Sequence, residues 1–469
     1  GAALGNHEFD YGPVGPKAVP REKGDDPRGA LKARIAQAKF PFFAINVVDE
    51  KGQRPDYLKG SAVKELSGVR VGIIGAADEN TPNTTNRLNL GGLNFLDPAE
   101  PVRKEAERLR REEGVQAVVL VIHLGAGCDD NRLDAQEDVS SCKINDVFEL
   151  VKKLPEGLVD VVVSGHTHRG VAKRIGRTAI LQPYSNGKYI GWATIPLGDK
   201  SAKPAVAGLV PVCAAVVDTA KGETCDPYQL RDAVGAPRPA KFLGQAMVPD
   251  PKVEALLKPD LAKVAKLKAE PLKSQAADSF QRSYASESAL GNLMADIGRE
   301  TAAGADIGLT NAGGVRADLS PGPLNYGHIY NVYPFDNQLA VMEVTGATLL
   351  KMAEMGIDGT RGVFIWSSNL KLEAKGCAIT RATIDGKDLS PAKYYKVATN
   401  DFLAGSFVNL KIPEDKITIY WDANFIVRDL AAGVLRRWNR VLNSADFFNP
   451  QSPRIRGLGE CKPEAAAKR

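Results

Sequence analysis

Long apolar runs are absent from this chain of 469 residues. None approaches the roughly 18 consecutive apolar residues that a transmembrane helix requires, so we expect no membrane span. Internal repeats are absent as well, which excludes repeat architectures. The only low-complexity stretch is the short end at 462–469.

Strong charge of either sign is lacking too. The chain holds 61 basic and 56 acidic residues for a net charge of +5. Its basic residues form no stripe that could follow a nucleic-acid backbone, so we expect no nucleic-acid polymer as a partner. Its 43% apolar and 25% charged residues are ordinary for a globular protein, and its length predicts two domains.

Cysteine is scarce, and none of the six cysteines forms a C-x-x-C pair. This excludes zinc ribbons and thioredoxin-like redox motifs. Cys128 and Cys142 bracket one short polar stretch, and Cys213 and Cys225 bracket another. Such spacing favours two local disulfides and an oxidising compartment, although six reduced cysteines in a cytosolic enzyme remain the alternative.

The first half alternates helices with short apolar strands. We predict strands at 71–76, 117–122 and 159–163. A helix between them should have Asp97 as its N-cap, Pro98 at its first position and Glu100 in a capping box. Strands that are apolar throughout and joined by helices indicate a sheet covered on both faces, which is an α/β domain.

The pattern breaks between about 212 and 272, where lysine, proline and alanine accumulate. Residues 251–267 predict a lysine-rich amphipathic helix that connects two domains. A second α/β unit follows, with a helix around Leu293, a strand at 306–309 and a hairpin turn at Asp385-Gly386. The predicted division is a first domain at 1–235, a connector at 236–272, a second domain at 273–460 and a tail at 461–469.

Histidine is also rare, and four of the five histidines lie in three short motifs. His7 lies in the loop sequence GNHEFD at 5–10, and His123 directly follows the second predicted strand. His166 and His168 follow the third predicted strand in the sequence SGHTH. Because the ends of successive parallel strands lie side by side, these side chains are expected to converge on one edge of the sheet.

The residue types in these motifs suit divalent metal ions. Imidazole nitrogens and amide oxygens bind zinc or manganese. Two such ions about 3.5–4 Å apart can activate a shared water and hold the oxygens of a phosphoryl group during its displacement. A histidine outside the ligand set can bond the phosphoryl oxygens while a carboxylate fixes its tautomer, and His7 with Asp10 suits that role.

Each motif has a simpler interpretation when it is taken alone. Gly5-Asn6-His7 is then an ordinary turn, and His123 is then a hydrogen-bonded core histidine. His166 and His168 are more specific, because two side chains at i and i+2 after a strand can point the same way. The three motifs together favour a metal site.

These motifs resemble the later metal motifs of calcineurin-like metallophosphoesterases. Three further motifs resemble the C-terminal domain of 5′-nucleotidases: NAGGVR at 311–316, YPFD at 333–336 and ATNDFLA at 398–404. The similarity covers nearly the whole chain, in the domain order of that family. It implies a four-layer α/β metallophosphoesterase sandwich followed by a second, smaller α/β domain.

The resemblance also implies roles for individual residues. Asn6, His123 and His166 would bind one metal ion, and His168 would bind a second. His7, oriented by Asp10, would stabilise the transition state. The substrate-binding residues implied in the second domain are Asn311, Gly314, Arg316, Phe335 and Phe402, with the two phenylalanines gripping a nucleobase. Without the resemblance, core packing of the phenylalanines and a tight turn at the glycines are the preferred interpretations.

Two departures from the family pattern affect these expectations. The opening Asp-x-His and Gly-Asp segments of the family, which supply the carboxylate that bridges both ions, are not found. We therefore expect this chain alone to bind metal weakly and to hydrolyse esters slowly. Gly405-Ser406-Phe407-Val408 replaces a Gly-Gly-Asp-Gly stretch, and Ser286 replaces a substrate-binding arginine of some members. These changes leave the identity of the phosphate ester open.

The implied function is that of a metal-dependent phosphomonoesterase, a 5′-nucleotidase that uses two divalent ions, zinc or manganese. It would convert nucleotides to nucleoside and phosphate by attack of a metal-bound water. The alternatives are hydrolysis of cyclic nucleotides, nucleotide sugars or another ester, and nucleotide binding without catalysis. The expected location is the periplasm or the cell exterior, and the oligomeric state stays open.

Overall fold

The computed structural model describes residues 1–15, 17–129, 135–198, 202–219, 222–225, 234–357, 363–407, 410–413, 416–420, 423–459 and 461. The chain separates into two compact units, Gly1–Leu256 and Leu257–Arg469. The boundary between them falls inside helix α5 (Pro251–Lys268). The finer division into four segments stays a prediction, and Val408 and residues 462–469 lie outside the described residues.

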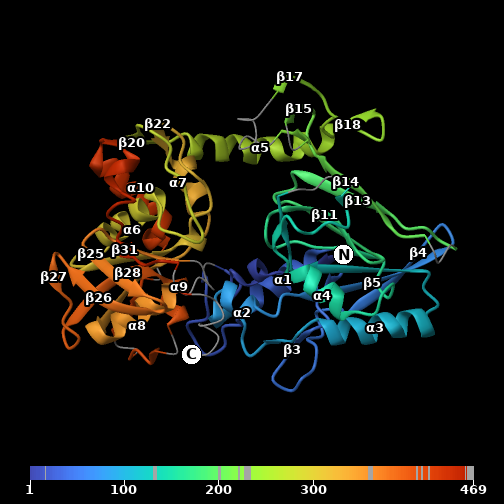
Figure 1. The fold of residues 1–469 in the computed structure, drawn as a ribbon, viewed down its shortest axis with the longest axis horizontal. Coiled ribbons are helices and arrows are strands. Elements are labelled where there is room, and N and C mark those ends of the chain that lie inside the picture. The colour runs from blue at the N-terminus through green and yellow to red at the C-terminus, as the bar shows by residue number, and fades with distance from the viewer. Residues whose placement is uncertain are drawn as a thin grey trace. The chain divides into compact units, whose positions relative to one another are not determined.

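A six-stranded mixed sheet forms the centre of the first unit (Figure 1). Its strands, in spatial order, are β11 (Gly170–Ile175), β12 (Thr178–Pro183), β10 (Val161–Val163), β7 (Ala117–His123), β5 (Val69–Ala77) and β4 (Ser61–Leu66). The four inner strands run parallel, and the two edge strands are antiparallel to their neighbours. The three predicted strands are present as β5, β7 and β10, each within two residues of its expected bounds.

Helices cover one face of this sheet and a two-stranded sheet covers the other. α3 (Ala99–Glu112) buries Val102, Ala106 and Leu109, which pack with α4 (Asp146–Lys153) and the strand residues of that face. β13 (Tyr189–Thr194) and β14 (Ala205–Pro211) pack on the opposite face. Burying each large aliphatic side chain contributes about 1.5–3 kcal/mol, so these layers hold the strand ends in place.

The start of α3 differs from its prediction. Pro98 is the N-cap residue and not the first helical residue, and no capping box forms. Asp97 Oδ1 accepts a hydrogen bond from the Ala99 amide at 2.9 Å, while Glu100 accepts from Arg103 at 2.7 and 2.8 Å. The Glu100 carboxylate therefore pairs with Arg103, one turn along the helix, and does not form the expected capping box.

Short elements around the N-terminal segment tie it to the sheet. β1 (Ala2–Ala3) pairs in parallel with β2 (Phe42–Phe43), and the 3₁₀ helix η1 (Asn6–Phe9) follows β1. Leu4 and Phe9 lie in a buried cluster with Leu31 of α1 (Gly29–Gln37). β3 (Val47–Val48) and β6 (Asn94–Phe95) form a further small pair. This cluster fixes the loop that carries the first predicted site residues.

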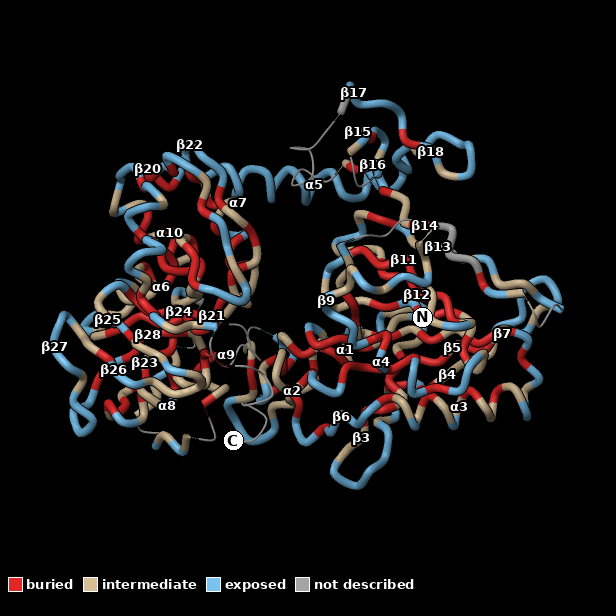
Figure 2. The backbone as a smooth tube through the Cα atoms, viewed as in Figure 1, coloured by how far each residue is buried: buried red, intermediate tan, exposed pale blue. Residues whose placement is uncertain are grey.

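α5 is a helix as predicted, but no side chain of it is buried. Figure 2 shows it in the exposed colour along its whole length. Before it, β15 (Ala215–Thr219), β16 (Gly222–Thr224) and β17 (Val234–Pro239) form a small sheet, and β18 (Lys241–Phe242) pairs with β19 (Gln245–Ala246). The expected apolar face of α5 is therefore exposed and not buried in a core.

The described residues of the second unit form three sheets, and five α-helices follow α5 along the chain. Its five-stranded sheet has the order β24 (Phe364–Trp366), β21 (Ile307–Asn311), β28 (Tyr394–Asn400), β23 (Leu339–Thr345) and β29 (Ile417–Ile419). The four-stranded sheet consists of β27 (Lys387–Asp388), β26 (Ala378–Ile384), β25 (Leu370–Lys375) and β31 (Ile455–Arg456). The three-stranded sheet consists of β22 (Gly322–Asn325), β20 (Pro271–Ala276) and β30 (Val441–Leu442). The helices are α6 (Ala289–Thr301), α7 (Tyr326–Val332), α8 (Gly346–Ile357), α9 (Asp401–Ser406) and α10 (Val427–Trp438).

Several predictions for this unit are confirmed. α6 buries Leu290, Leu293, Met294 and Ile297 on one face. The strand expected at 306–309 is β21. Asp385-Gly386 joins β26 to β27 with positive φ at both residues, as a tight hairpin turn requires.

The cysteines form three disulfides, and no free cysteine is found among the described residues. The two predicted local pairs, Cys128–Cys142 and Cys213–Cys225, are confirmed. The third, Cys377–Cys461, was not predicted, because 84 residues separate its partners. Among the described residues, no helix has the length and apolar character that a membrane crossing requires.

Candidate active site

The predicted metal residues in the first unit follow neighbouring parallel strands. β7 lies between β5 and β10, with Ala77 paired to His123 and Val163 paired to Val121. His123 is the last residue of β7, and His166 follows β10 in the next loop. The sheet therefore brings both histidines to one edge.

Three possible ligand atoms converge at this edge. The Nε2 atom of His123 lies 3.0 Å from Asn6 Oδ1 and 3.2 Å from His166 Nδ1. Asn6 is buried, and its Nδ2 donates to the Thr84 carbonyl at 2.9 Å. That bond fixes the amide orientation, so that the oxygen of Asn6 faces the histidines.

At two backbone positions beside these atoms, only glycine fits without a close contact. A Cβ atom on Gly5 would lie 2.9 Å from the His123 ring, and one on Gly125 would lie 2.2 Å from the Gly165 carbonyl oxygen. His166 and His168 have φ values of 77° and 58°, which non-glycine residues adopt at a cost of about 1–3 kcal/mol. Such strain is typical of functional sites, where the surrounding structure enforces it.

The electrostatics of His123 favour the form that binds metal. Burial, with further contributions from His166, His7 and His168, lowers the pKa of His123 to about 3. The ring is therefore neutral near pH 7, and a neutral imidazole is the metal-binding form. Two imidazole nitrogens and an amide oxygen in this arrangement fit one divalent cation.

This triad includes an amide, and acidic groups take no direct part in it. Among the described residues, no group of three or more His, Cys, Asp or Glu side chains is arranged to hold a metal ion. Only His123 and His166 of the three converging side chains are of those kinds, because the third is Asn6. The convergence therefore does not count as such a group. The ligand roles of Asn6, His123, His166 and His168 therefore stay predictions.

His7 and Asp10 form the pair that was expected of them. His7 Nδ1 lies 2.9 and 3.1 Å from the two carboxylate oxygens of Asp10. This contact fixes the proton on Nδ1 and directs Nε2 away from the carboxylate. The His7 side chain is 42% exposed, so it is open to a ligand. His168 is also exposed, in the loop after β10.

Asp78 is a residue at this edge that the sequence analysis missed. It directly follows β5, is buried, and places Oδ2 3.7 Å from His166 Nε2. Its Oδ1 accepts from the Asn80 amide at 2.8 Å. A carboxylate behind a ligating histidine orients the ring and strengthens its basicity. Its position after a predicted strand was the only signal available.

The predicted substrate residues of the second unit also follow strand ends. β21 ends at Asn311 and its parallel neighbour β28 ends at Asn400, just before Phe402. β23 is antiparallel to β28 and pairs Leu339 with Asn400, which brings the loop containing Phe335 to the same edge. Sheet topology thus gathers all three sequence motifs.

Individual contacts within this group are close. Arg316 Nη1 donates to the Gly313 carbonyl at 3.2 Å, and its Cζ lies 5.8 Å from the centre of the Phe335 ring. A Cβ atom on Gly314 would lie 2.9 Å from Asn311 Oδ1, so glycine permits this turn. Phe335 and Phe402 are half-buried, and Phe402 packs partly on the core of the five-stranded sheet.

Known proteins with similar sequences indicate which family this chain resembles. Residues 263–413 match the family model of the 5′-nucleotidase C-terminal domain. Cell wall protein Lmo0130 of Listeria monocytogenes is 29% identical over 86% of this chain and 51% of its own length. Protein UshA of Yersinia enterocolitica is 25% identical over 86% of this chain and 70% of its own length.

A solved structure supplies the comparison of folds. The 5′-nucleotidase precursor of Thermus thermophilus has a TM-score of 0.66 and 24% identity, over 97% of this chain and 83% of its own. The predicted resemblance to 5′-nucleotidases and the predicted two-part α/β fold are confirmed. The chain spans about half the length of the Listeria relative, 51%.

Proposed function

We propose that this chain, whose residues 263–413 carry a 5′-nucleotidase C-terminal domain, is a metal-dependent phosphomonoesterase that releases phosphate from nucleotides. The observation that carries the proposal is that His123 Nε2 lies 3.0 Å from Asn6 Oδ1 and 3.2 Å from His166 Nδ1. An amide oxygen and two imidazole nitrogens that can each present a lone pair lie together where β7 and β10 end, and this combination of atoms suits a divalent cation.

Three of the chain's own side chains supply candidate ligand atoms for one ion. Asn6, His123 and His166 would hold one divalent ion, zinc or manganese, and His168 would contribute to a second. When bound, such ions neutralise phosphoryl charge and lower the pKa of water. Asp78 would add negative charge behind His166 and strengthen that ligand.

His7 would act on the phosphoryl group directly. Asp10 holds its Nδ1, so Nε2 is the atom that would donate or accept a proton at an oxygen of the ester. A histidine held in this way typically contributes 10²–10⁴-fold to a rate. Its exposure, in contrast to the burial of Asn6, fits a role toward substrate and not toward structure.

The second unit would bind the nucleoside part. Arg316 offers a guanidinium to phosphate or ribose oxygens, and the faces of Phe335 and Phe402 would stack on the base. Asn311 and Gly314 shape the turn that precedes Arg316. Aromatic stacking tolerates any base, so this arrangement supports nucleotides as a class.

We further propose a periplasmic or extracellular location. Three disulfides form, and disulfides persist in oxidising compartments. The name of the Listeria relative, a cell wall protein, agrees with this location.

Metal and substrate titrations of the chain test the proposal. After removal of metal by chelation, Mn²⁺ is added back, and hydrolysis of AMP, a cyclic nucleotide and a nucleotide sugar is measured. We expect AMP to be the best substrate, and His7→Ala to lower kcat by roughly 10²–10⁴-fold without changing the amount of bound metal. Asn6→Ala should instead weaken metal binding.

His328 is a suitable control, because it is the remaining histidine and its Nδ1 accepts from the Asn325 amide in α7. His328→Gln should keep both metal binding and turnover. The proposal is wrong if His7→Ala leaves turnover intact, and a preference for the cyclic nucleotide or nucleotide sugar would favour those esters. Nucleotide binding without turnover would leave only a binding protein.

A further inference from the structure

A buried arginine holds the loop at 333–336 in the second unit. Arg428, at the start of α10, is 6% exposed. Its Nη1 donates to the carbonyl oxygens of Phe335 at 3.2 Å and Tyr333 at 3.4 Å. Its Nη2 donates to Asp336 Oδ1 at 2.7 Å. One guanidinium thus contacts three of the four residues at 333–336.

The guanidinium is itself fixed from the other side. Its Nε donates to the Tyr326 hydroxyl at 3.0 Å, and the same hydroxyl donates to Asp429. The ring of Tyr330 lies 4.7 Å from Arg428 Cζ, within the range of a cation–π contact. Both tyrosines belong to α7, so the arginine joins α7, α10 and the loop.

A second anchor holds the end of the same loop. Asp401 Oδ1 accepts from the Gln338 amide at 3.0 Å and from Asn337 Nδ2 at 3.1 Å. The Val427 amide donates to the Asn337 carbonyl at 2.9 Å, and Gln338 bridges to Ile426. The loop is therefore held along its length, yet Phe335 remains half-buried with its ring against Arg316.

We propose that Arg428 is a positioning residue, which holds the 333–336 backbone so that the Phe335 ring is ready for a nucleobase. It touches no substrate and acts through Phe335. Because the Arg428 guanidinium bonds the loop at several points, the loop is already ordered before a base binds. Less conformational entropy is then lost on binding. This inference rests on the proposed function, because it assumes that Phe335 contacts the base.

Arg454 provides a matched control in the same unit. It is 4% exposed, donates to Asp296 at 2.8 and 3.0 Å, and donates to the Trp366 carbonyl at 2.7 Å. It is thus an equally buried arginine with the same kinds of partners, and its hydrogen bonds to these partners do not involve the loop at 333–338. Arg454→Lys should cost stability without changing the Phe335 loop.

The experiment compares Arg428→Lys and Arg454→Lys in the full chain. Amide hydrogen exchange of the 333–338 segment is measured without ligand, and adenosine affinity is measured by calorimetry. For Arg428→Lys we expect at least tenfold faster exchange in that segment and about tenfold weaker adenosine binding. The KM for AMP should rise by a similar factor while kcat stays within twofold.

Asp336→Asn serves as a second variant, because it removes the negative charge from one partner of the guanidinium, keeps an oxygen that can accept from Arg428 Nη2, and leaves the buried arginine in place. It should give a smaller change in the same direction. Unchanged exchange in Arg428→Lys, or an equal change in Arg454→Lys, would overturn the positioning role. If Phe335→Ala binds adenosine as the wild type does, the base contact itself is wrong, and the exchange data still decide whether Arg428 orders the loop.

Discussion

At the residue scale, Asp401 is a buried carboxylate of the second unit whose pKa is raised. It begins α9 and is 5% exposed. Burial raises its pKa to about 6, against the opposing hydrogen bonds from Asn337, Gln338 and Phe402. The folded protein therefore favours the neutral acid more than the unfolded chain does. Because Asp401 contacts the Phe335 loop, its charge also bears on the candidate site.

Asp401→Asn should change how stability depends on pH. The stability that protonated Asp401 contributes is fully present below about pH 4 and is lost as the pH rises through about 6. Asparagine keeps an oxygen toward Gln338 and Asn337 without this loss. We expect the variant to gain roughly 1–3 kcal/mol over the wild type between pH 4 and pH 7.

Urea unfolding of both proteins at the two pH values measures this difference. Asp385→Asn is the control, because Asp385 is exposed in a hairpin turn that asparagine adopts equally well. Its change should stay within about 0.5 kcal/mol. Parallel pH curves for the wild type and Asp401→Asn would contradict the prediction.

The candidate site shows which positions the sequence alone can bring together. The meeting of His123, His166 and Asn6 at one edge of the sheet was predictable, because side chains of metal-binding types follow apolar strands or lie in a glycine-flanked turn, while their ligand roles stay predictions. Asp78 was not, because one aspartate after a strand is common. Its distance to His166 depends on the order of three strands in the sheet.

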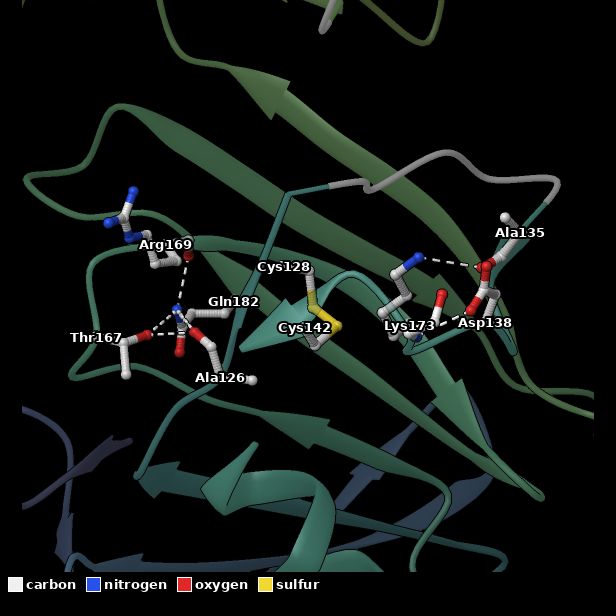
Figure 3. The surroundings of a disulfide bond; sticks show 10 residues. Ala126, Cys128, Ala135, Asp138, Cys142, Thr167, Arg169, Lys173 and Gln182 are labelled. Atoms are coloured by element: carbon white, nitrogen blue, oxygen red, sulfur yellow. Dashed lines mark hydrogen bonds between the residues drawn. A yellow bond between two sulfur atoms is a disulfide. The ribbon is translucent and has the colours of Figure 1, made fainter. Parts of the chain in front are cut away.

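At the scale of elements, one side chain from the neighbouring strand β12 contacts both the loop after β7 and the loop after β10. Gln182 of β12 is fully buried, and Figure 3 shows its amide pointing at both loops. Its Nε2 donates to Ala126 O at 3.2 Å in the loop after β7, and to Thr167 Oγ1 and Arg169 O at 2.6 Å in the loop after β10. It therefore links the loop after His123 to the loop of His166.

Gln182→Met should weaken metal binding by loosening these two loops. Methionine has a similar volume and no donor, so the Arg169 carbonyl and Thr167 Oγ1 lose the Gln182 amide, and the Ala126 carbonyl keeps only the bond from Thr167 Oγ1. Loss of such an outer contact typically lowers metal affinity 10–100-fold. Calorimetric titration of the metal-free protein with Mn²⁺ or Zn²⁺ measures the effect.

Thr178→Val, at the other end of β12, is the matched control. Thr178 Oγ1 donates to the Val159 carbonyl at 2.8 Å, and Thr178 is similarly buried, but it lies at the opposite end of β12 from Gln182 and the two loops that Gln182 contacts. The variant should keep metal affinity within about twofold while losing some stability. Equal effects of both substitutions would mean that Gln182 acts only through general stability.

At the scale of the whole molecule, each unit has its own hydrophobic cores. The clusters of the first unit and those of the second share no residue among the described part of the chain. Phe148 of α4 is buried in the first unit, and Phe364 of β24 is buried in the five-stranded sheet of the second. The two units should therefore unfold as separate cooperative transitions.

Differential scanning calorimetry of Phe148→Ala and Phe364→Ala tests this separation. Each substitution should remove about 3–5 kcal/mol, lowering the midpoint of one transition and leaving the other in place. Zinc or manganese should raise the transition that Phe148→Ala lowers, and adenosine should raise the other. If both transitions shift together in either variant, the units are not energetically independent.

The sequence by itself determined the α/β class, the main strands, the connecting helix, two of the disulfides and the motifs at strand ends, because each is set by patterns within a few residues. Tertiary structure alone decided that Asp78 approaches His166, that Gln182 joins two loops, and that Arg428 reaches a loop more than 90 residues away. Such contacts depend on strand order and on the packing of helices against one another. Those are long-range consequences of burial that no local pattern records.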